Sequence, residues 1–210
     1  EGGIDLVLLQ DFGNFVYVNF RHGVLKFGDH EWIRMNANVK AAGHEEWFDV
    51  VNERDEVIGQ EQRAVVHAKE LWHRAVYVLV FNEAGQLFMQ KRALTKDSSP
   101  GMWTISCTGH VDAGEDYDAA AIRELGEELG WVPSSPPARI LRVAASEVTG
   151  WEFLWIYQLK AEGPFTLHPE EIDCGEWLEL AELSRRLVAC PNDFCSAFRW
   201  LWPRLAEKLI

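Results

Sequence analysis

The chain has 210 residues, 48% of them hydrophobic, which is enough for one sizeable core and a small appendage. Its formal net charge of −13 disfavours a nucleic-acid polymer as a partner, because an acidic surface is repelled by a phosphate backbone. A small phosphorylated ligand stays compatible with this charge if a metal ion and a few local cations supply positive charge.

Residues 1–44 differ in pattern from the rest of the chain. Short apolar or alternating runs, separated by Gly, Asn and Asp, predict two or three short strands: Ile4–Leu9, Phe15–Phe20 and Val24–Phe27. These runs carry no recognisable chemistry. We interpret residues 1–44 as a β-rich N-terminal extension that packs on a main domain of residues 45–210 or on a partner subunit, and the second arrangement would make the protein a homodimer.

From Trp47 onwards the pattern becomes mixed α/β. The strands predicted from apolar and β-branched runs are Phe48–Val51, Val57–Gly59, Ala75–Phe81, Gln86–Lys91, Trp103–Thr108, Ile140–Ala144, Glu152–Leu159 and Asp173–Leu178. The predicted helices are Asp118–Leu129, Ala181–Leu187 and Phe194–Lys208, whereas Val65–Leu71 fits a short helix or a loop. Pro203 is expected to kink or split the last helix, because its ring removes a helical hydrogen bond.

No hydrophobic run reaches membrane-spanning length and no signal-peptide pattern is visible, so we expect no membrane contact. The four cysteines form no C-x-x-C pair, and their spacing fits no zinc template. Small buried thiols in a reducing compartment explain them, and we therefore expect a cytoplasmic protein.

The chemically informative stretch is residues 109–131. Glu124, Glu127 and Glu128 are spaced i, i+3 and i+4, so they project from one face of the predicted helix. Like charges at this spacing would weaken an isolated helix by about a few tenths of a kcal/mol per pair. A divalent cation removes this repulsion, and hard oxygen donors favour Mg²⁺ or Mn²⁺.

The neighbours of these glutamates favour a metal site over a solvated acidic face. Arg123 lies among the carboxylates, where a guanidinium can fix their rotamers through two-pronged hydrogen bonds. Gly109 and Gly114 permit close approach of the backbone to a metal or phosphate, and Glu115 lies in the loop before the helix.

This stretch resembles the signature of the Nudix hydrolase superfamily: Gly, five residues, Glu, seven residues, Arg-Glu, an apolar residue, any residue, Glu-Glu, any residue, Gly and an apolar residue. The defined places are filled by Gly109, Glu115, Arg123, Glu124, Leu125, Glu127, Glu128, Gly130 and Trp131. The resemblance implies an α/β/α sandwich around a mixed β-sheet. It also implies an enzyme, dependent on Mg²⁺ or Mn²⁺, that cleaves a diphosphate linkage in a small molecule such as a nucleoside diphosphate linked to another group.

The resemblance further implies residue roles. The implied metal ligands are Glu124, Glu127, Glu128 and the carbonyl group of Gly109. Arg123 would orient Glu115 or a metal ligand. The general base would be Glu127 or Glu171, because many members of the family place a further glutamate just before a late strand.

Residues 47–180 are also similar, more loosely, to the branch related to isopentenyl-diphosphate isomerase. The similar positions are Trp47-Phe48-Asp49-Val50, His73-Arg74-Ala75, Lys91-Arg92-Ala93-Leu94-Thr95-Lys96, Ser99-Pro100-Gly101, Trp103-Thr104 and Gly109-His110. By position, the residues that resemble metal ligands of that isomerase are His67, His73, His110 and Glu152. Whether they form a second metal site stays open at this point.

The chain departs from that isomerase at several positions. Thr108 stands in place of the catalytic cysteine, and Cys107 lies one residue early, where the strand pleat should turn it to the opposite face. Gly150 replaces a second glutamate near Glu152. We therefore favour hydrolysis over allylic isomerisation. A non-catalytic sensor of a diphosphate ligand is a third reading, which the full set of carboxylates disfavours.

The diphosphate needs positive or hydrogen-bonding partners. We expect Arg92 and Lys96 to bind it, because the isomerase-like branch holds its diphosphate at these positions. Arg74 and Lys91 are weaker candidates. His73 and His110 flank the expected pocket, and we expect them to bind substrate as well.

Overall fold

The computed structural model describes residues 6–11, 14–19, 25–27, 30–33 and 45–209. The chain divides into two compact units, Glu1–His44 and Glu45–Ile210. Among the described residues, no helix is both long enough and apolar enough to cross a membrane.

The N-terminal unit contains two small antiparallel pairs. Strands β1 (Leu6–Asp11) and β2 (Asn14–Asn19) form one pair, and β3 (Leu25–Phe27) and β4 (His30–Ile33) form the other. The three predicted strands overlap β1, β2 and β3, although their outermost residues lie outside the described ones. The sequence analysis missed β4, a short strand without apolar alternation. The packing of this unit on the rest of the chain or on a partner stays a prediction.

The larger unit is built on a mixed seven-stranded sheet. Its main order is β11-β12-β7-β8-β13, with β10 beside β7 and β9 beside β8, and only the pairing of β7 with β12 is parallel. The strand bounds are β7 His73–Phe81, β8 Leu87–Arg92, β9 Trp103–Thr104, β10 Cys107–His110, β11 Ala138–Val143, β12 Glu152–Lys160 and β13 Ile172–Leu178.

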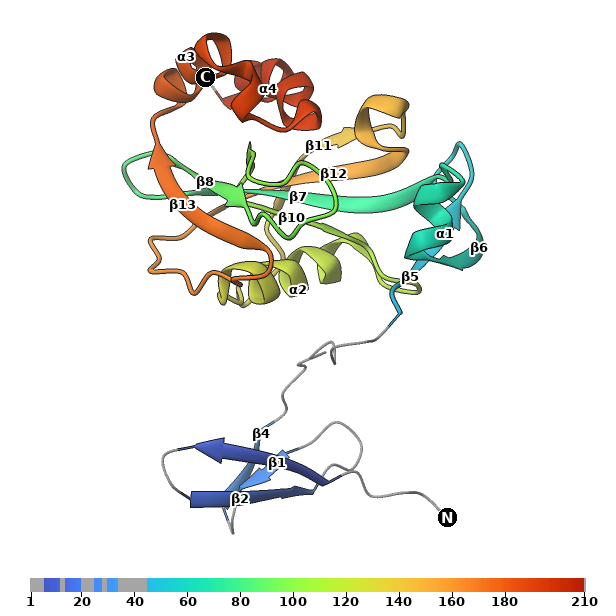
Figure 1. The fold of residues 1–210 in the computed structure, drawn as a ribbon, viewed down its shortest axis with the longest axis vertical. Coiled ribbons are helices and arrows are strands. Elements are labelled where there is room, and N and C mark those ends of the chain that lie inside the picture. Colours follow the sequence, from blue (N-terminus) through green and yellow to red (C-terminus); the bar gives the residue numbers. More distant parts are fainter. Residues whose placement is uncertain (1–5, 12–13, 20–24, 28–29, 34–44, 210) are drawn as a thin grey trace. The chain divides into compact units, whose positions relative to one another are not determined.

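Helices cover both faces of this sheet, which confirms the predicted α/β/α sandwich (Figure 1). Helix α2 (Tyr117–Leu129) lies on one face, and α3 (Leu180–Ala189) and α4 (Ser196–Leu209) lie on the other. Short 3-10 turns occupy Glu147–Thr149 and Pro191–Asp193. A separate hairpin of β5 (Trp47–Val51) and β6 (Val57–Gln62) precedes the short helix α1 (Arg63–Ala68).

The core follows the alternation of the central strand β7. Val76, Val78 and Val80 pack with the apolar face of α2, whereas Leu79 and Phe81 pack with residues of α3 and α4. Because successive side chains of a strand point to opposite faces, one strand supplies both cores.

Two predicted elements differ from the observed ones. The strand predicted at Trp103–Thr108 is split into β9 and β10, because the two halves pair with different neighbours. Buried Ser106 stabilises the break: its hydroxyl accepts a hydrogen bond from the Val80 amide and donates one to the Phe88 carbonyl. By contrast, α4 is not split, and exposed Pro203 lies inside one continuous helix.

Candidate active site

Helix α2 is held at both ends. The Asp116 carboxylate accepts hydrogen bonds from the backbone amides of Asp118 and Ala119, at 2.8 and 2.9 Å, so Asp116 is the N-cap. Gly130 ends the helix with a left-handed φ of 62°, and a Cβ there would lie 2.8 Å from Cβ of Thr166. The glutamates between these ends are therefore fixed relative to the sheet.

Arg123 is the centre of the carboxylate cluster. Its Nε and one terminal nitrogen donate to both oxygens of Glu115, at 3.0 and 2.8 Å, and its other terminal nitrogen donates to Glu124 and Glu127, at 2.5 and 3.2 Å. It also donates to the His110 carbonyl at 2.8 Å. Burial alone would lower the pKa of Arg123, but the hydrogen bond and charges of these carboxylates outweigh burial and raise it.

Gly109 is required by the closeness of Glu124. A Cβ at position 109 would lie only 1.9 Å from the carboxyl carbon of Glu124. The Glu124 carboxylate thus rests against the β10 backbone, and any side chain at position 109 would displace it. The structure brings together these two residues, which sequence analysis assigned to one metal site.

Glu128 is buried between α2 and the sheet, with 4% of its surface exposed. Its Oε2 accepts hydrogen bonds from Nε2 of Gln90, at 2.9 Å, and from the Thr108 amide, at 3.1 Å. Burial raises the pKa values of both Glu124 and Glu128, and the closeness of other carboxylates adds to the shift. Both glutamates would therefore ionise more readily beside an additional positive charge.

Glu127 points to the same deficit. Its Oε1 is buried and has no hydrogen-bond partner among the described residues, while its Oε2 accepts from Arg123. A buried, unpartnered carboxylate oxygen is costly unless a cation binds it. The donor set consists of hard carboxylate oxygens, so the cluster fits a divalent cation of the Mg²⁺ or Mn²⁺ type.

Lys96 and Glu171 form an ion pair beside this cluster. The negative charge of Glu171 contributes to the raised pKa of Glu128, so the pair lies near the face of α2 that carries the glutamates. The loop after β8 is tied to the start of β13 by hydrogen bonds from the Ala93 amide to the Glu171 carbonyl and from Thr95 to the Glu170 carbonyl.

The other predicted phosphate ligands are placed differently. The Arg92 guanidinium donates to the backbone and side-chain oxygens of Ser98, at 2.9 and 3.2 Å, so it braces the loop after β8. Arg74 is bound to Asp55 through a 2.6 Å hydrogen bond and serves the scaffold.

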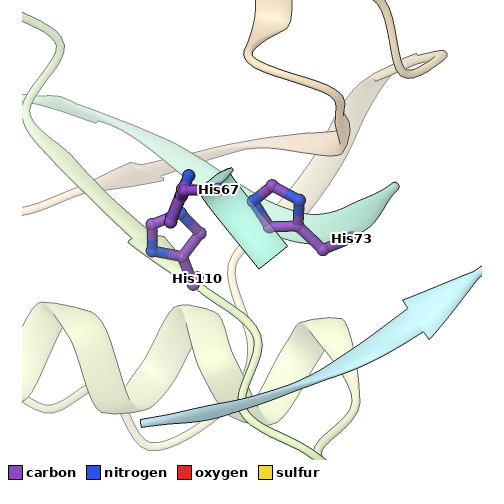
Figure 2. Close-up of side chains that lie close together, drawn as sticks. All are labelled: His67, His73 and His110. Carbon is purple, nitrogen blue, oxygen red and sulfur yellow. The ribbon is translucent and has the colours of Figure 1, made fainter. Parts of the chain in front are cut away.

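Three histidines gather at the start of β7. Figure 2 shows the rings of His67, His73 and His110 grouped together, and their ligand atoms all lie within 4.8 Å of one another. They come from α1, β7 and β10. The fully buried ring of Phe48 stacks on His73 and His110, with centroid distances of 5.6 and 4.5 Å.

Glu152 completes the histidine cluster. Its Oε1 accepts a 3.1 Å hydrogen bond from Nε2 of His110 and lies 3.7 Å from Nε2 of His73. Burial alone would raise the pKa of Glu152, but its hydrogen bond with His110 and the closeness of both imidazoles hold it at about 2. Burial, together with the neighbouring imidazoles, lowers the pKa of His67 to about 4.

The two ring nitrogens of His73 have different surroundings. Its Nδ1 donates to the Leu71 carbonyl at 2.8 Å, so in the neutral form of the ring the lone pair is on Nε2. That Nε2 is buried and has no hydrogen-bond partner among the described residues. Metal-binding histidines commonly donate their second ring nitrogen to a carbonyl group in this way.

The two clusters lie on opposite faces of β10. Gly109 pairs with Val76, which belongs to the α2 side of the core, whereas His110 pairs with Ala75, which belongs to the other side. The same pleat buries Cys107 completely on the α2 side, as the sequence predicted, and burial raises the pKa of its thiol.

Sequence analysis missed Gln90 and did not weigh Phe48 for the site. The available signal for Gln90 was its position directly after the apolar run Leu87–Met89, two residues from Phe88, which faces α2. Such a residue is buried only where a partner satisfies its amide, and here the partner is Glu128.

We expect the metal-free protein to lose stability as the pH rises from about 6.5 to about 8. The folded-state pKa values of Glu124 and Glu128 lie above their ordinary value of 4.5. The folded protein therefore holds protons that the unfolded chain has lost, so this stabilisation is present at low pH and disappears as the pH rises through the raised pKa values. Thermal unfolding across this range, with and without Mg²⁺, measures the effect.

The Glu128→Gln variant is the matched control, because it removes one of the titrating groups. Its stability should fall less with pH than that of the wild type, and Mg²⁺ should offset the wild-type loss. His67 acts in the opposite direction only below its ordinary pKa of 6.5, outside this range. Equal pH dependence in the wild type and the variant would contradict the expectation.

Comparison with known proteins agrees with this geometry. The NUDIX domain family model matches residues 71–197. An uncharacterized Nudix hydrolase of Yersinia pestis is 36% identical over 157 residues, which cover 75% of this chain and 85% of that protein. Isopentenyl-diphosphate Delta-isomerase 2 of Photorhabdus laumondii is 31% identical over 153 residues, which cover 71% and 86% of the two chains.

Among solved structures, the crystal structure of the DR0079 protein from Deinococcus radiodurans superposes with a TM-score of 0.66 at 30% identity. The match covers 76% of this chain and 98% of that one. The family model spans more than half of the chain, and its signature residues form the carboxylate cluster on α2. The chain therefore belongs to the Nudix hydrolase family.

Proposed function

We propose that the protein is a Mg²⁺- or Mn²⁺-dependent hydrolase that cleaves a diphosphate linkage in a small molecule. The observation that carries the proposal is the buried, unpartnered Oε1 of Glu127 within a cluster of buried carboxylates. In this proposal the metal ligands are Glu124, Glu127, Glu128 and the carbonyl group of Gly109.

When bound, the cation would neutralise part of the diphosphate charge and make a water molecule more acidic. The protein supplies the remaining elements. Arg123 keeps Glu115, Glu124 and Glu127 in fixed rotamers. Glu127 or Glu171 would accept the proton of the attacking water, and Lys96, which is paired with Glu171, would bind a phosphate oxygen.

These residues do not determine which chemical group is attached to the diphosphate of the substrate. The cluster recognises a diphosphate, and a nucleoside diphosphate linked to another group is one member of that class. The Arg92 guanidinium is bound to Ser98, and His73 and His110 would contact substrate from the other face of β10. A panel of nucleotide, sugar and isoprenoid diphosphates with each metal therefore tests the class.

Substitution of a proposed metal ligand should slow hydrolysis strongly. Loss of a residue that only supports a metal ligand typically lowers activity by roughly 10- to 100-fold. Because Glu127 is itself a proposed ligand, we expect Glu127→Gln to lower kcat by at least that factor. The measurement is phosphate or nucleotide release from the best diphosphate of the panel, together with Mn²⁺ titration calorimetry. The helical, exposed Glu207→Gln variant should match the wild type in both. Wild-type Mn²⁺ affinity in Glu127→Gln would remove Glu127 from the site.

The resemblance to an isomerase leads to a second prediction. The resemblance implies that such an isomerase protonates and deprotonates carbon with the help of a cysteine. In this chain Cys107 is buried on the α2 side of β10, whereas Thr108 lies on the opposite side. A hydroxyl group is a far weaker acid than a thiol, so Thr108 is a poor substitute. We therefore expect no deuterated allylic product to form during incubation with isopentenyl diphosphate, Mg²⁺ and D₂O.

The same experiment can overturn the hydrolase proposal. Deuterium incorporation that is lost in Cys107→Ala would establish isomerisation. A protein that binds Mg²⁺ yet cleaves no diphosphate of the panel would instead support a non-catalytic sensor.

We also propose that His67, His73, His110 and Glu152 hold a second metal ion. The unpartnered Nε2 of His73 supports this, and imidazole ligands suit Zn²⁺ and similar ions better than Mg²⁺. Substituting Co²⁺ should give a visible absorption spectrum that His73→Ala abolishes. The His168→Ala control, a histidine outside the cluster, should keep it, as should Glu127→Gln. An unchanged spectrum in His73→Ala would contradict the assignment.

A further inference from the structure

The glutamates of α2 are held by two kinds of partner. Glu124 and Glu127 accept hydrogen bonds from the charged guanidinium of Arg123. Glu128 instead accepts from neutral donors, the side-chain amide of Gln90 and the backbone amide of Thr108. A neutral donor orients a carboxylate without cancelling its charge, whereas a cation does both.

Gln90 is built into this arrangement. It lies on β8 with 1% of its surface exposed, and its Nε2 is 2.9 Å from Oε2 of Glu128. The Thr108 amide on β10 reaches the same oxygen, so the two donors set the rotation of the Glu128 carboxylate. Strand β8 pairs with β7 at Leu87 and then diverges from it, while β10 pairs with β7 further along. Glu128 therefore joins β8 and β10 where these two strands are not paired with each other.

From this geometry we propose that Gln90 is a positioning residue for metal binding. It orients Glu128 toward the cation while leaving the carboxylate charge available to that cation. The inference rests on the proposed function, because it assumes that Glu128 is a metal ligand. It assigns a role to a residue outside the signature stretch, on a strand remote in sequence from α2.

Mn²⁺ binding, followed by the electron paramagnetic resonance signal of the free ion, tests the proposal. The Gln90→Met variant keeps the length of the side chain and removes the donor. Since loss of an outer partner typically weakens metal binding by about 10- to 100-fold, we expect the Kd for Mn²⁺ to rise by about 10-fold or more. At saturating Mn²⁺, KM for the diphosphate should stay unchanged. Gln158→Met, on β12, is the matched control and should bind like the wild type.

A double-substitution cycle separates positioning from a structural role. In a Glu128→Gln background, Gln90→Met should cause no further loss of Mn²⁺ affinity, because Gln90 acts only through Glu128. An equal loss in both backgrounds would overturn the proposal. If Gln90→Met does not fold, Gln90→Asn keeps a buried amide but draws the donor away from Glu128, and a weaker Mn²⁺ affinity is expected again.

The titration also distinguishes this inference from the proposed function. Mn²⁺ binding that is weakened by Glu127→Gln but unaffected by Gln90→Met would overturn the role of Gln90 alone. A wild-type protein that binds no Mn²⁺ would overturn both.

Discussion

The structure depends on one constraint, the burial of several carboxylates around a single guanidinium. Arg123 bonds to both oxygens of Glu115, to Glu124 and Glu127, and to the His110 carbonyl, so it ties the loop before α2, the helix and β10 together. Burial raises the pKa values of Glu124 and Glu128, and the neighbouring carboxylates, which the one charge of Arg123 does not balance, add to the shift. Such surplus buried negative charge fits the cation of the proposed function.

The scaffold around α2 explains how this charge is kept in place. The Asp55 carboxylate receives hydrogen bonds from Arg74, Tyr117 and Arg142, which join the β5–β6 turn to β7, α2 and β11. Asp55 itself has a φ of 63°, a left-handed conformation that Asp adopts more readily than most residues with a side chain. On the same helix, Asp118 accepts from Tyr157 and Arg139. The N-terminal end of α2 is therefore fixed from several directions.

Strand β10 separates two kinds of chemistry by the simple alternation of its side chains. Gly109 faces the carboxylates, while His110 joins the imidazole cluster on the other side. The hard carboxylate oxygens of α2 and the softer imidazole nitrogens thus lie on opposite faces of one strand. The same alternation buries the Cys107 thiol on the α2 side, away from the histidines. The sequence similarity to an isomerase therefore does not place a cysteine beside the histidine cluster.

The sequence by itself determined the helix that carries the carboxylates, because i, i+3 and i+4 spacing and the glycine at its end are local properties. It also determined the mixed α/β class and most strands, through their apolar runs. Only the tertiary structure decided that Trp103–Thr108 divides between two neighbours, that Lys96 meets Glu171, and that Gln90 meets Glu128. Those contacts join residues far apart in the chain, and their formation depends on strand pairing and burial, which no local pattern encodes.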